Sequence, residues 1–213
     1  MNIQDFLSAF EHQAPLLACW VAYALFHSLT ASHLCKNWVK WRWPTIFASY
    51  RLLYNGLAVL LLVPIAWLAF RFPGPMLIVW TGVLFWLLNG LAALSVLAFL
   101  RNGSGYDLQV FLGLRPESCE STPKLVISGW HRFVRHPWYS LGLVLLWTRD
   151  MSAASLISTL AITVYFVVGS RLEERKLLVE FGERYREYQR RVPGLLPRPW
   201  RRLSKADAAR LAG

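Results

Sequence analysis

The chain has 213 residues, of which 55% are hydrophobic, and it contains eleven tryptophans. This composition is unusual for a soluble globular protein and indicates that a membrane surrounds much of the chain. The formal net charge of +11 would suit a nucleic-acid partner, but a basic C-terminal tail beside anionic lipid headgroups explains it without one. We therefore expect membrane lipids, and no nucleic acid, as partners.

Four segments contain no Asp, Glu, Lys or Arg and predict membrane-spanning helices: residues 13–34, 52–70, 75–100 and 153–170. Each reaches or approaches the ~20 residues that a helix needs to cross a bilayer. The first residues carry Asp5 and Glu11, which is unlike a signal peptide. We therefore expect the first helix to remain in the mature protein.

A fifth uncharged segment, residues 137–148, is shorter. Its length in a helix is roughly 18 Å against a ~30 Å hydrocarbon core, so we expect this helix to begin inside the preceding basic segment. Arg149 and Asp150 then form a polar tip before the next apolar segment. Residues 137–170 are therefore predicted to form a helical hairpin.

The basic residues predict the orientation, because Lys and Arg near helix ends favour the cytoplasmic side. Lys36, Lys40 and Arg42 mark the first loop as cytoplasmic, whereas the turn at residues 71–74 is nearly uncharged. The connection at residues 101–135 and the chain after residue 171 are basic again. We expect the N-terminus outside and the C-terminus in the cytoplasm.

Polar side chains in the first two helices allow two interpretations. His27, Ser28 and His33 lie on or near one face at helical spacing; bonding to neighbouring helices is favoured over a catalytic role. Arg51 and Asn55, four residues apart, are equally consistent with reaching outward to the interface and with lining an internal polar site.

The three cysteines do not predict a site. Cys19, Cys35 and Cys119 are odd in number and lack metal-ligand spacing, so we expect neither a disulfide framework nor a bound metal.

Two segments outside the spans have their own patterns. Residues 101–130 are rich in Gly, Pro, Ser and charge, which predicts a loop with one short helix that covers a site. Residues 171–191 repeat apolar side chains at helical spacing and predict an amphipathic helix in the headgroup layer. The prolines at 193–199 exclude regular helix there.

A candidate site lies at the start of the hairpin. Arg135 and His136 precede Pro137, which suits the first turn of a helix, where free backbone N–H groups favour an anion. Because a hairpin returns its ends to one side, Arg171, Glu173 and Glu174 are predicted to lie opposite.

Together the two clusters offer the groups that S-adenosylmethionine requires. Arg135 and His136 suit an anionic end, Glu173 and Glu174 suit a sugar diol or an ammonium group, and aromatic faces suit a planar ring or a sulfonium. The aromatic candidates are Trp130, Trp138 and Tyr139. The alternative is that both clusters only reach the headgroups and pair there.

The pattern V-x-S-G-x-x-x-x-V-R-H-P-x-Y-x-x-G, followed by E-E-x-x-L and F-G-x-x-Y-x-x-Y-x-x-x-V-P, covers about residues 124–197. It strongly resembles the isoprenylcysteine carboxyl methyltransferase-like family of integral membrane methyltransferases and its bacterial members. The resemblance implies an S-adenosylmethionine-dependent methyltransferase in a bacterial inner membrane. The N-terminal H-S-L-T-A-S and Y-R-L-L-Y-N are more weakly similar to NnrU-like membrane proteins.

The resemblance also implies roles for individual residues. The cofactor-binding positions are Leu125, Val126, His136, Pro137, Trp138, Tyr139 and Glu173, with Glu174 as an adjacent alternative. This chain has His131 where the family commonly has tyrosine, and the family's carboxylate-binding arginine would align near Gly169, so that Arg171 is its nearest candidate.

Methyl transfer is an in-line displacement, so the protein mainly aligns the reactants and excludes water. Arg135 or Arg171 would orient an anionic acceptor, and His131 would remove a proton from a thiol or an amine. The acceptor stays open among a lipophilic or small thiol, a carboxylate and a lipid amine. Two other functions are considered: a non-catalytic NnrU-like scaffold, and a sterol-reductase-like oxidoreductase that uses NADPH.

The prediction is therefore an all-α integral membrane protein with about five transmembrane helices, including a C-terminal helical hairpin, followed by a cytoplasmic amphipathic helix. We divide the chain into a three-helix transmembrane scaffold (residues 1–100), a cytoplasmic connector (101–136) and a cofactor-binding region with the hairpin and the C-terminal helix (137–213).

Overall fold

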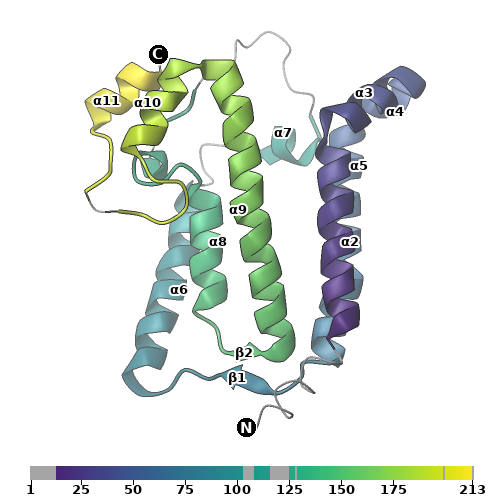
Figure 1. Cartoon of the computed structure of the whole chain (residues 1–213), viewed down its shortest axis with the longest axis vertical. Helices are drawn as coiled ribbons and strands as arrows, with labels where there is room; N and C mark the ends of the chain where they lie inside the picture. The colour runs from purple at the N-terminus through teal and green to yellow at the C-terminus, as the bar shows by residue number, and fades with distance from the viewer. Residues whose placement is uncertain (1–12, 103–107, 116–124, 128, 199, 213) are drawn as a thin grey trace. The chain divides into compact units, whose positions relative to one another are not determined.

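The computed structural model describes residues 13–102, 108–115, 125–127, 129–198 and 200–212. These residues are almost entirely helical (Figure 1). Within this part of the chain, four helices are long and apolar enough to cross a membrane: α2 (Ala14–Ala31), α5 (Tyr50–Arg71), α6 (Gly82–Asn102) and α9 (Ala153–Phe181). The predicted all-α membrane fold is confirmed.

The shorter apolar helix α8 (Pro137–Trp147) is the predicted fifth helix. Its 11 residues cover about 16 Å, roughly half of the hydrocarbon core. Its start coincides with Pro137, so it does not extend back into the basic segment as the sequence suggested. The proline is tolerated there because a helix's first N–H has no intrahelical acceptor.

The remaining elements are short. They are α3 (His33–Arg42), α4 (Pro44–Phe47), β1 (Met76–Ile78), α7 (Leu108–Leu112), a 3₁₀ turn (Gly129–Arg132), β2 (Met151–Ser152), α10 (Glu183–Arg191) and α11 (Lys205–Ala212). The predicted short helix of the connector corresponds to α7. The third span begins at Gly82 rather than at residue 75, because residues 76–78 form a strand.

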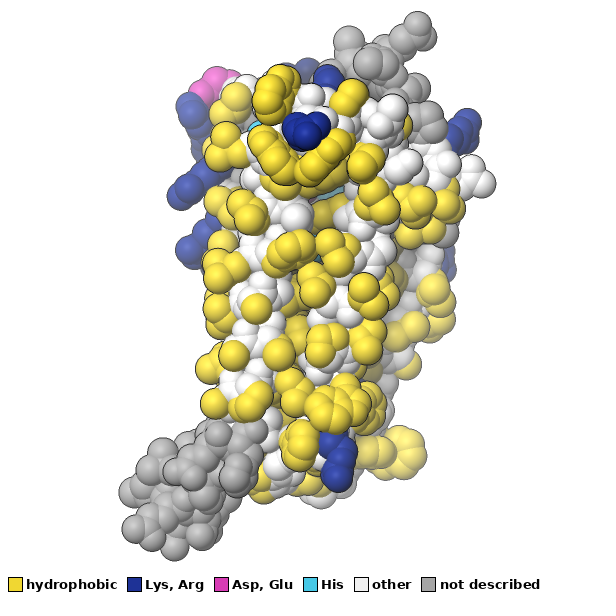
Figure 2. Space-filling model, turned by 90° about the vertical axis from the view of Figure 1, so that its right-hand side faces the viewer, with side chains coloured by type: hydrophobic (Ala, Val, Ile, Leu, Met, Phe, Trp, Pro, Cys, Tyr) yellow, Lys and Arg dark blue, Asp and Glu magenta, His cyan; other side chains and the backbone are white. Residues whose placement is uncertain are grey.

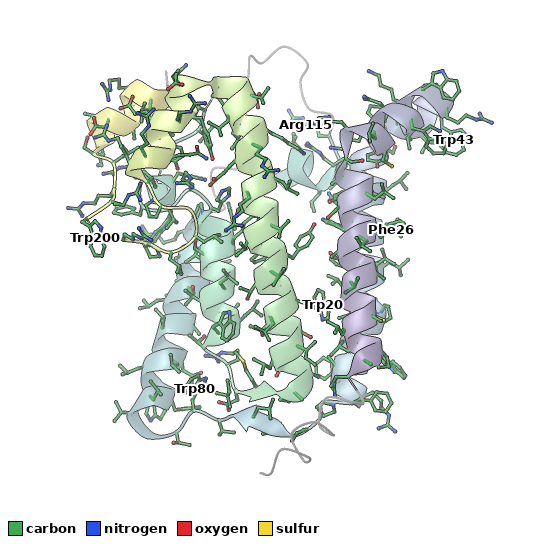
Figure 3. All side chains as sticks on the ribbon, viewed as in Figure 1. Trp20, Phe26, Trp43, Trp80, Arg115 and Trp200 are labelled. Atoms are coloured by element: carbon green, nitrogen blue, oxygen red, sulfur yellow. The ribbon has the colours of Figure 1, made fainter. Side chains whose placement is uncertain are left out.

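The chain forms two compact units. The first contains residues 1–79, 106–118 and 150–161. In it, α2 packs along α5, and Leu16, Ile65 and Ala154 form a buried apolar cluster. Trp20 of α2 donates from its indole nitrogen to the Ser158 hydroxyl at 3.0 Å (Figure 3), which ties the start of α9 to α2. Strands β1 and β2 pair antiparallel, with Met76 opposite Ser152.

The polar side chains of the first unit serve helix packing. The His27 Nε2 atom lies 2.5 Å from the Tyr54 hydroxyl, as expected for a bond between neighbouring helices. Arg51 donates to the carbonyl of Val110 at 3.0 Å, and Asn55 donates to the carbonyl of Leu112 at 3.1 Å. These contacts tie α7 to α5 through the terminal carbonyls that a helix leaves unsatisfied.

The second unit contains residues 80–105, 119–149 and 162–213. In it, α8 packs against α6: the Ser95 hydroxyl donates to the Leu141 carbonyl at 3.1 Å, and Phe99 meets Trp138 edge to face at 4.3 Å. On its other side α8 runs antiparallel to α9. Trp147 donates to Thr163 at 3.1 Å, and nearer the start of α8 Tyr139 stacks on Phe166.

Hydrophobic side chains cover most of the face shown in Figure 2, and charged side chains are few across its middle. Large apolar side chains of α2 and α5 are strongly exposed, including Leu25 (68%), Val59 (67%) and Trp67 (60%). Exposure of this extent on long apolar helices is expected when lipid, not water, covers them. The protein is an integral membrane protein.

The last span extends further than the charge-free window suggested. Helix α9 continues through the charged residues 171–176 and ends at Phe181, and only then does α10 begin. Helix α11, which follows the proline segment, was not predicted from the sequence. It packs on α10, where Tyr185, Tyr188, Leu203 and Leu211 belong to one buried cluster.

Gly182 makes the break between α9 and α10. Its φ of 57° and ψ of −131° lie in a region that only glycine adopts readily. We expect Gly182→Ala to lower the free energy of unfolding by ~1–3 kcal/mol, measured as a lower Tm in detergent. As a control, Gly90→Ala lies inside α6 with no atom within 4 Å of the added methyl group. It should leave Tm unchanged or raise it. An unchanged Tm for Gly182→Ala would contradict this explanation.

Candidate functional site

A non-helical C-terminal segment holds the start of α8. Three successive carbonyls of this segment accept hydrogen bonds: Pro193 from the Arg135 backbone N–H (2.9 Å), Gly194 from the His136 backbone N–H (3.1 Å) and Leu195 from the Ser140 hydroxyl (2.5 Å). We call residues 193–195 the strap. The first two of these carbonyls satisfy backbone N–H groups that would otherwise have no acceptor in a helix or a sheet.

Beneath the strap lies a buried polar cluster, which consists of Arg135, His136, Glu174 and Gln189. One Glu174 oxygen accepts from Arg135 Nε at 2.8 Å and lies 2.7 Å from Arg135 Nη2; the same oxygen lies 2.9 Å from His136 Nε2. The other Glu174 oxygen accepts from the Gln189 side chain at 2.9 Å. The side chains of Arg135 and Glu174 are each only 13% exposed.

Arg135 connects this cluster to the backbone. Its Nη1 donates to the carbonyls of Gln189 (3.1 Å) and Val192, the residues that lead into the strap. The planar guanidinium group suits such fixed, multiple contacts. Arg135 therefore holds Glu174 and the end of α10 together.

His136 is the most enclosed imidazole near the site, with 7% of it exposed. Its ring is parallel to that of Tyr139 at 5.6 Å, and Tyr139 stacks in turn on Phe166 at 4.5 Å. The Nδ1 atom lies 3.5 Å from the carboxylate of Glu173, which is 51% exposed. His136 thus lies between two carboxylates, as the hairpin prediction required.

The two carboxylates change the protonation of His136, which precedes the apolar part of α8. Burial lowers its pKa, but the hydrogen bonds with Glu173 and Glu174 outweigh burial and raise the pKa above its usual value. The folded protein therefore binds this proton more tightly than the unfolded chain. The resulting stabilisation is fully present below about pH 6.5 and is lost as the pH rises through the raised pKa.

We therefore expect the Tm of the wild-type protein in detergent to fall as the pH rises from about 6.5 through the raised pKa of His136. His136→Asn removes the titrating group and should show a smaller fall over the same range. The measurement is a thermal melt of both proteins across the pH series. Equal pH dependence in the two proteins would contradict the assignment to His136.

Two cavities flank the strap, and Leu195 and Leu196 contribute to both. The polar cavity has a volume of about 330 Å³, and its charged and polar lining residues are Arg135, Ser170, Arg171, Glu174 and Arg198. Arg171 and Arg198 have no carboxylate partner in the described part of the chain. This cavity therefore presents uncompensated positive charge.

The apolar cavity has a volume of about 420 Å³. Tryptophan, phenylalanine and aliphatic side chains from residues 130–134, α8 and residues 195–197 line it. Ser140 contributes a polar side chain, but its hydroxyl already donates to the carbonyls of His136 and Leu195. The cavity thus suits an apolar occupant, because a polar one would lose its hydrogen bonds to water.

The other predicted site residues lie around this region. Leu125 is buried in the cluster of α10 and α11, and the neighbouring Val126 is 61% exposed. Pro137 is buried and lines the apolar cavity, while Trp138 faces Phe99 of α6. His131 lies in the 3₁₀ turn, where its carbonyl accepts from the Tyr188 hydroxyl at 2.6 Å. Its role as a base stays a prediction.

Three participants were not predicted from the sequence: Gln189, Ser140 and the strap. Gln189 carried one available signal, since it follows Tyr185 and Tyr188 within the F-G-x-x-Y-x-x-Y pattern. The strap carried none, because its contacts are made by backbone carbonyls.

Comparison with known proteins connects this geometry to an activity. Over 199 aligned residues the chain is 34% identical to methanethiol S-methyltransferase 2 of Bradyrhizobium diazoefficiens, covering 87% of this chain and 73% of the relative. The chain belongs to the isoprenylcysteine carboxyl methyltransferase-like family. As a member of this family it is a membrane methyltransferase.

Two further relatives of this methyltransferase carry the same name. The methanethiol S-methyltransferase of Mycobacterium tuberculosis is 32% identical, with 84% of this chain and 75% of the relative aligned. That of Crocosphaera subtropica is 30% identical, with 82% and 71% aligned. No family model matches the chain, and no solved structure matches it. The relatives favour the methyltransferase over the scaffold and reductase hypotheses.

Proposed function

We propose that the protein transfers the methyl group of S-adenosylmethionine to a small thiol such as methanethiol. The observation that carries the proposal is the Arg135–His136–Glu174 cluster, of which Arg135 and Glu174 line a cationic cavity that shares Leu195 and Leu196 with an apolar cavity. The names of the relatives support a thiol as the acceptor. As predicted from the basic loops, we place the cofactor side in the cytoplasm of a bacterium, with the N-terminus outside.

The polar cavity fits the charged part of the methyl donor. Its volume of about 330 Å³ falls in the ~300–1,000 Å³ range of small-molecule sites. Arg171 and Arg198 suit the donor's carboxylate, and the carboxylate of Glu173, exposed beside His136, suits its ammonium group or ribose diol. When bound, S-adenosylmethionine supplies an electrophilic methyl group on a sulfonium ion.

The arginines have different roles in this proposal. Arg135 is a positioning residue, because its guanidinium group is engaged by Glu174 and by the carbonyls that lead into the strap. Arg171 is exposed and faces the polar cavity, so it is the residue that contacts an anionic group of the donor or the acceptor.

The apolar cavity favours an acceptor that loses little on leaving water. A thiol hydrogen-bonds weakly, so its transfer into such a cavity costs less than that of an alcohol or an amine. The apolar lining disfavours water, which otherwise competes for the methyl group. His131, which follows the cavity residue Trp130 but lines neither cavity itself, is the proposed acceptor of the thiol proton, by way of its imidazole nitrogen.

Calorimetry with S-adenosylhomocysteine and a methanethiol methylation assay test the proposal on detergent-purified protein. Arg171→Gln should weaken S-adenosylhomocysteine binding about tenfold to a hundredfold, the loss expected for a hydrogen bond to a charged group. The control Arg175→Gln removes an exposed charge that lines neither cavity and should bind normally. His131→Gln should slow methylation without changing this affinity.

Binding of NADPH in place of S-adenosylhomocysteine would contradict the proposal and favour the reductase. Binding of S-adenosylhomocysteine without methylation of any thiol would keep the cofactor and overturn the acceptor.

A further inference from the structure

Helices α3 and α4, residues 33–47, form an arm that does not continue the axes of the spanning helices α2 and α5 (Figure 1). Ser32 ends α2 in an extended conformation and caps α3, its hydroxyl accepting from the Cys35 backbone N–H at 3.2 Å. Figure 1 shows α3 and α4 turning away from the end of α2 and α5. A change of direction at the end of a span is expected where a chain enters the interfacial layer.

Large aromatic and aliphatic side chains of this arm are exposed. Trp41 is 78% exposed, Trp38 53% and Trp43 41%, and Leu34 is 83% exposed. Trp43 lies on the arm beyond the end of α2 (Figure 3). Tryptophan is enriched at membrane–water interfaces, because its ring is apolar and its N–H is polar.

The cations of the arm are interleaved with these rings. Lys40 lies over the Phe47 ring at 5.9 Å, and the Arg42 guanidinium lies over the Trp43 ring at 5.5 Å. Residues 12–106 contain no Asp or Glu. The positive charge of Lys40 and Arg42 therefore has no carboxylate partner in the arm or in the helices that flank it.

Arginines of α10 and α11, unlike Lys40 and Arg42, have carboxylate partners. Arg186 and Arg190 both pair with Glu183, and Arg191 and Arg210 pair with Glu187 and Asp207. Much of the positive charge of α10 and α11 is thus neutralised within the protein. These four arginines are therefore weaker candidates than Lys40 and Arg42 for a contact with anionic headgroups.

We infer that the α3–α4 arm binds the headgroups of anionic phospholipids, with Lys40 and Arg42 on the phosphates and the exposed tryptophans at the level of the glycerol backbone. Both the positive charge and the exposed tryptophans of the arm favour an anionic phospholipid. A cation near an anionic surface gains about fivefold in binding, and exposed tryptophans gain from the apolar boundary beneath it. The inference is independent of the methyl acceptor.

The test is a titration of phosphatidylglycerol into the full-length protein in neutral bicelles, with Tm as the readout. Lys40→Gln with Arg42→Gln should raise the apparent dissociation constant of phosphatidylglycerol about 25-fold. The control Arg186→Gln with Arg190→Gln removes the same charge from residues already paired with Glu183, and should leave this constant within about twofold of wild type.

High salt should abolish the difference between wild type and the Lys40/Arg42 variant, because exposed charges are screened. Equal affinities of the two proteins at low salt would overturn the inference. A change in the number of chains per particle in the Lys40/Arg42 variant would also overturn it, because the arm would then be a contact between copies of the chain.

Discussion

Glu174→Gln is expected to weaken donor binding strongly and to destabilise the protein. The substitution keeps the size of the side chain and removes the charge that Arg135 and His136 share. Loss of one partner of a buried ion pair costs about 3–5 kcal/mol. Because Glu174 is 13% exposed, we expect a value near the lower end, about 3 kcal/mol.

Because Arg135 and Glu174 line the polar cavity, the substitution also changes the charge that the donor meets there. We expect S-adenosylhomocysteine affinity to fall about a hundredfold, which corresponds to about 3 kcal/mol of binding free energy. Thermal melts and calorimetry on one preparation measure both effects. Glu180→Gln is the matched control, because Glu180 is exposed on the same helix and should change neither. Normal Tm and normal affinity in Glu174→Gln would contradict the central role of the cluster.

Glu173→Gln separates the two glutamates. Glu173 is 51% exposed and meets only the edge of His136 at 3.5 Å, so its loss should lower Tm little. If Glu173 contacts the donor directly, the variant loses S-adenosylhomocysteine affinity while it stays folded. Unchanged affinity would mean that Glu174, and not Glu173, is the carboxylate that binds the donor.

Arg135→Lys is expected to have the second largest effect. Lysine keeps the positive charge, but it cannot bind Glu174 and the carbonyls of Gln189 and Val192 at the same time. Hydrogen bonds to charged groups contribute about 1.5–3 kcal/mol each, so we expect the loss of about 2–3 kcal/mol of stability and faster hydrogen exchange at the amides of residues 135 and 136, which donate to the strap carbonyls.

Arg186→Lys provides the control for this experiment. Arg186 pairs with Glu183 on the exposed face of α10, where lysine serves equally well. Exchange at the amides of Arg135 and His136 should therefore match that of the wild-type protein. Unchanged exchange in Arg135→Lys would mean that the strap is held by the backbone contacts alone.

The spans and the approach of Arg135 and His136 to Glu174 could be predicted from the sequence, because both depend on local patterns. Uncharged windows identify helices whose polar backbone must be satisfied internally, and R-H-P-W-Y identifies the start of α8. The end of α9 could not be predicted this way. Five of the six residues 171–176 are charged, so the window ends at Ser170, although the helix continues to Phe181.

The sequence also could not separate Glu173 from Glu174. Neighbouring residues on a helix are about 100° apart, so the choice depends on the rotation of α9 against α8, which tertiary packing sets. Helix α11, by contrast, has a start signal in the sequence. Ser204 accepts from the backbone N–H of Asp207 at 3.0 Å, and Ser followed three residues later by an acidic residue is typical of a helix N-terminus.

Arg135, His136 and Ser140 contact the strap through its backbone carbonyls. This has a consequence for protein engineering. Residues 193–195 should tolerate exchange for the corresponding tripeptide of a relative, provided that Arg135 and Ser140 are kept. The same feature makes the C-terminal segment a candidate for complementation in trans, in which a synthetic peptide restores a protein whose own chain has been cleaved after α10.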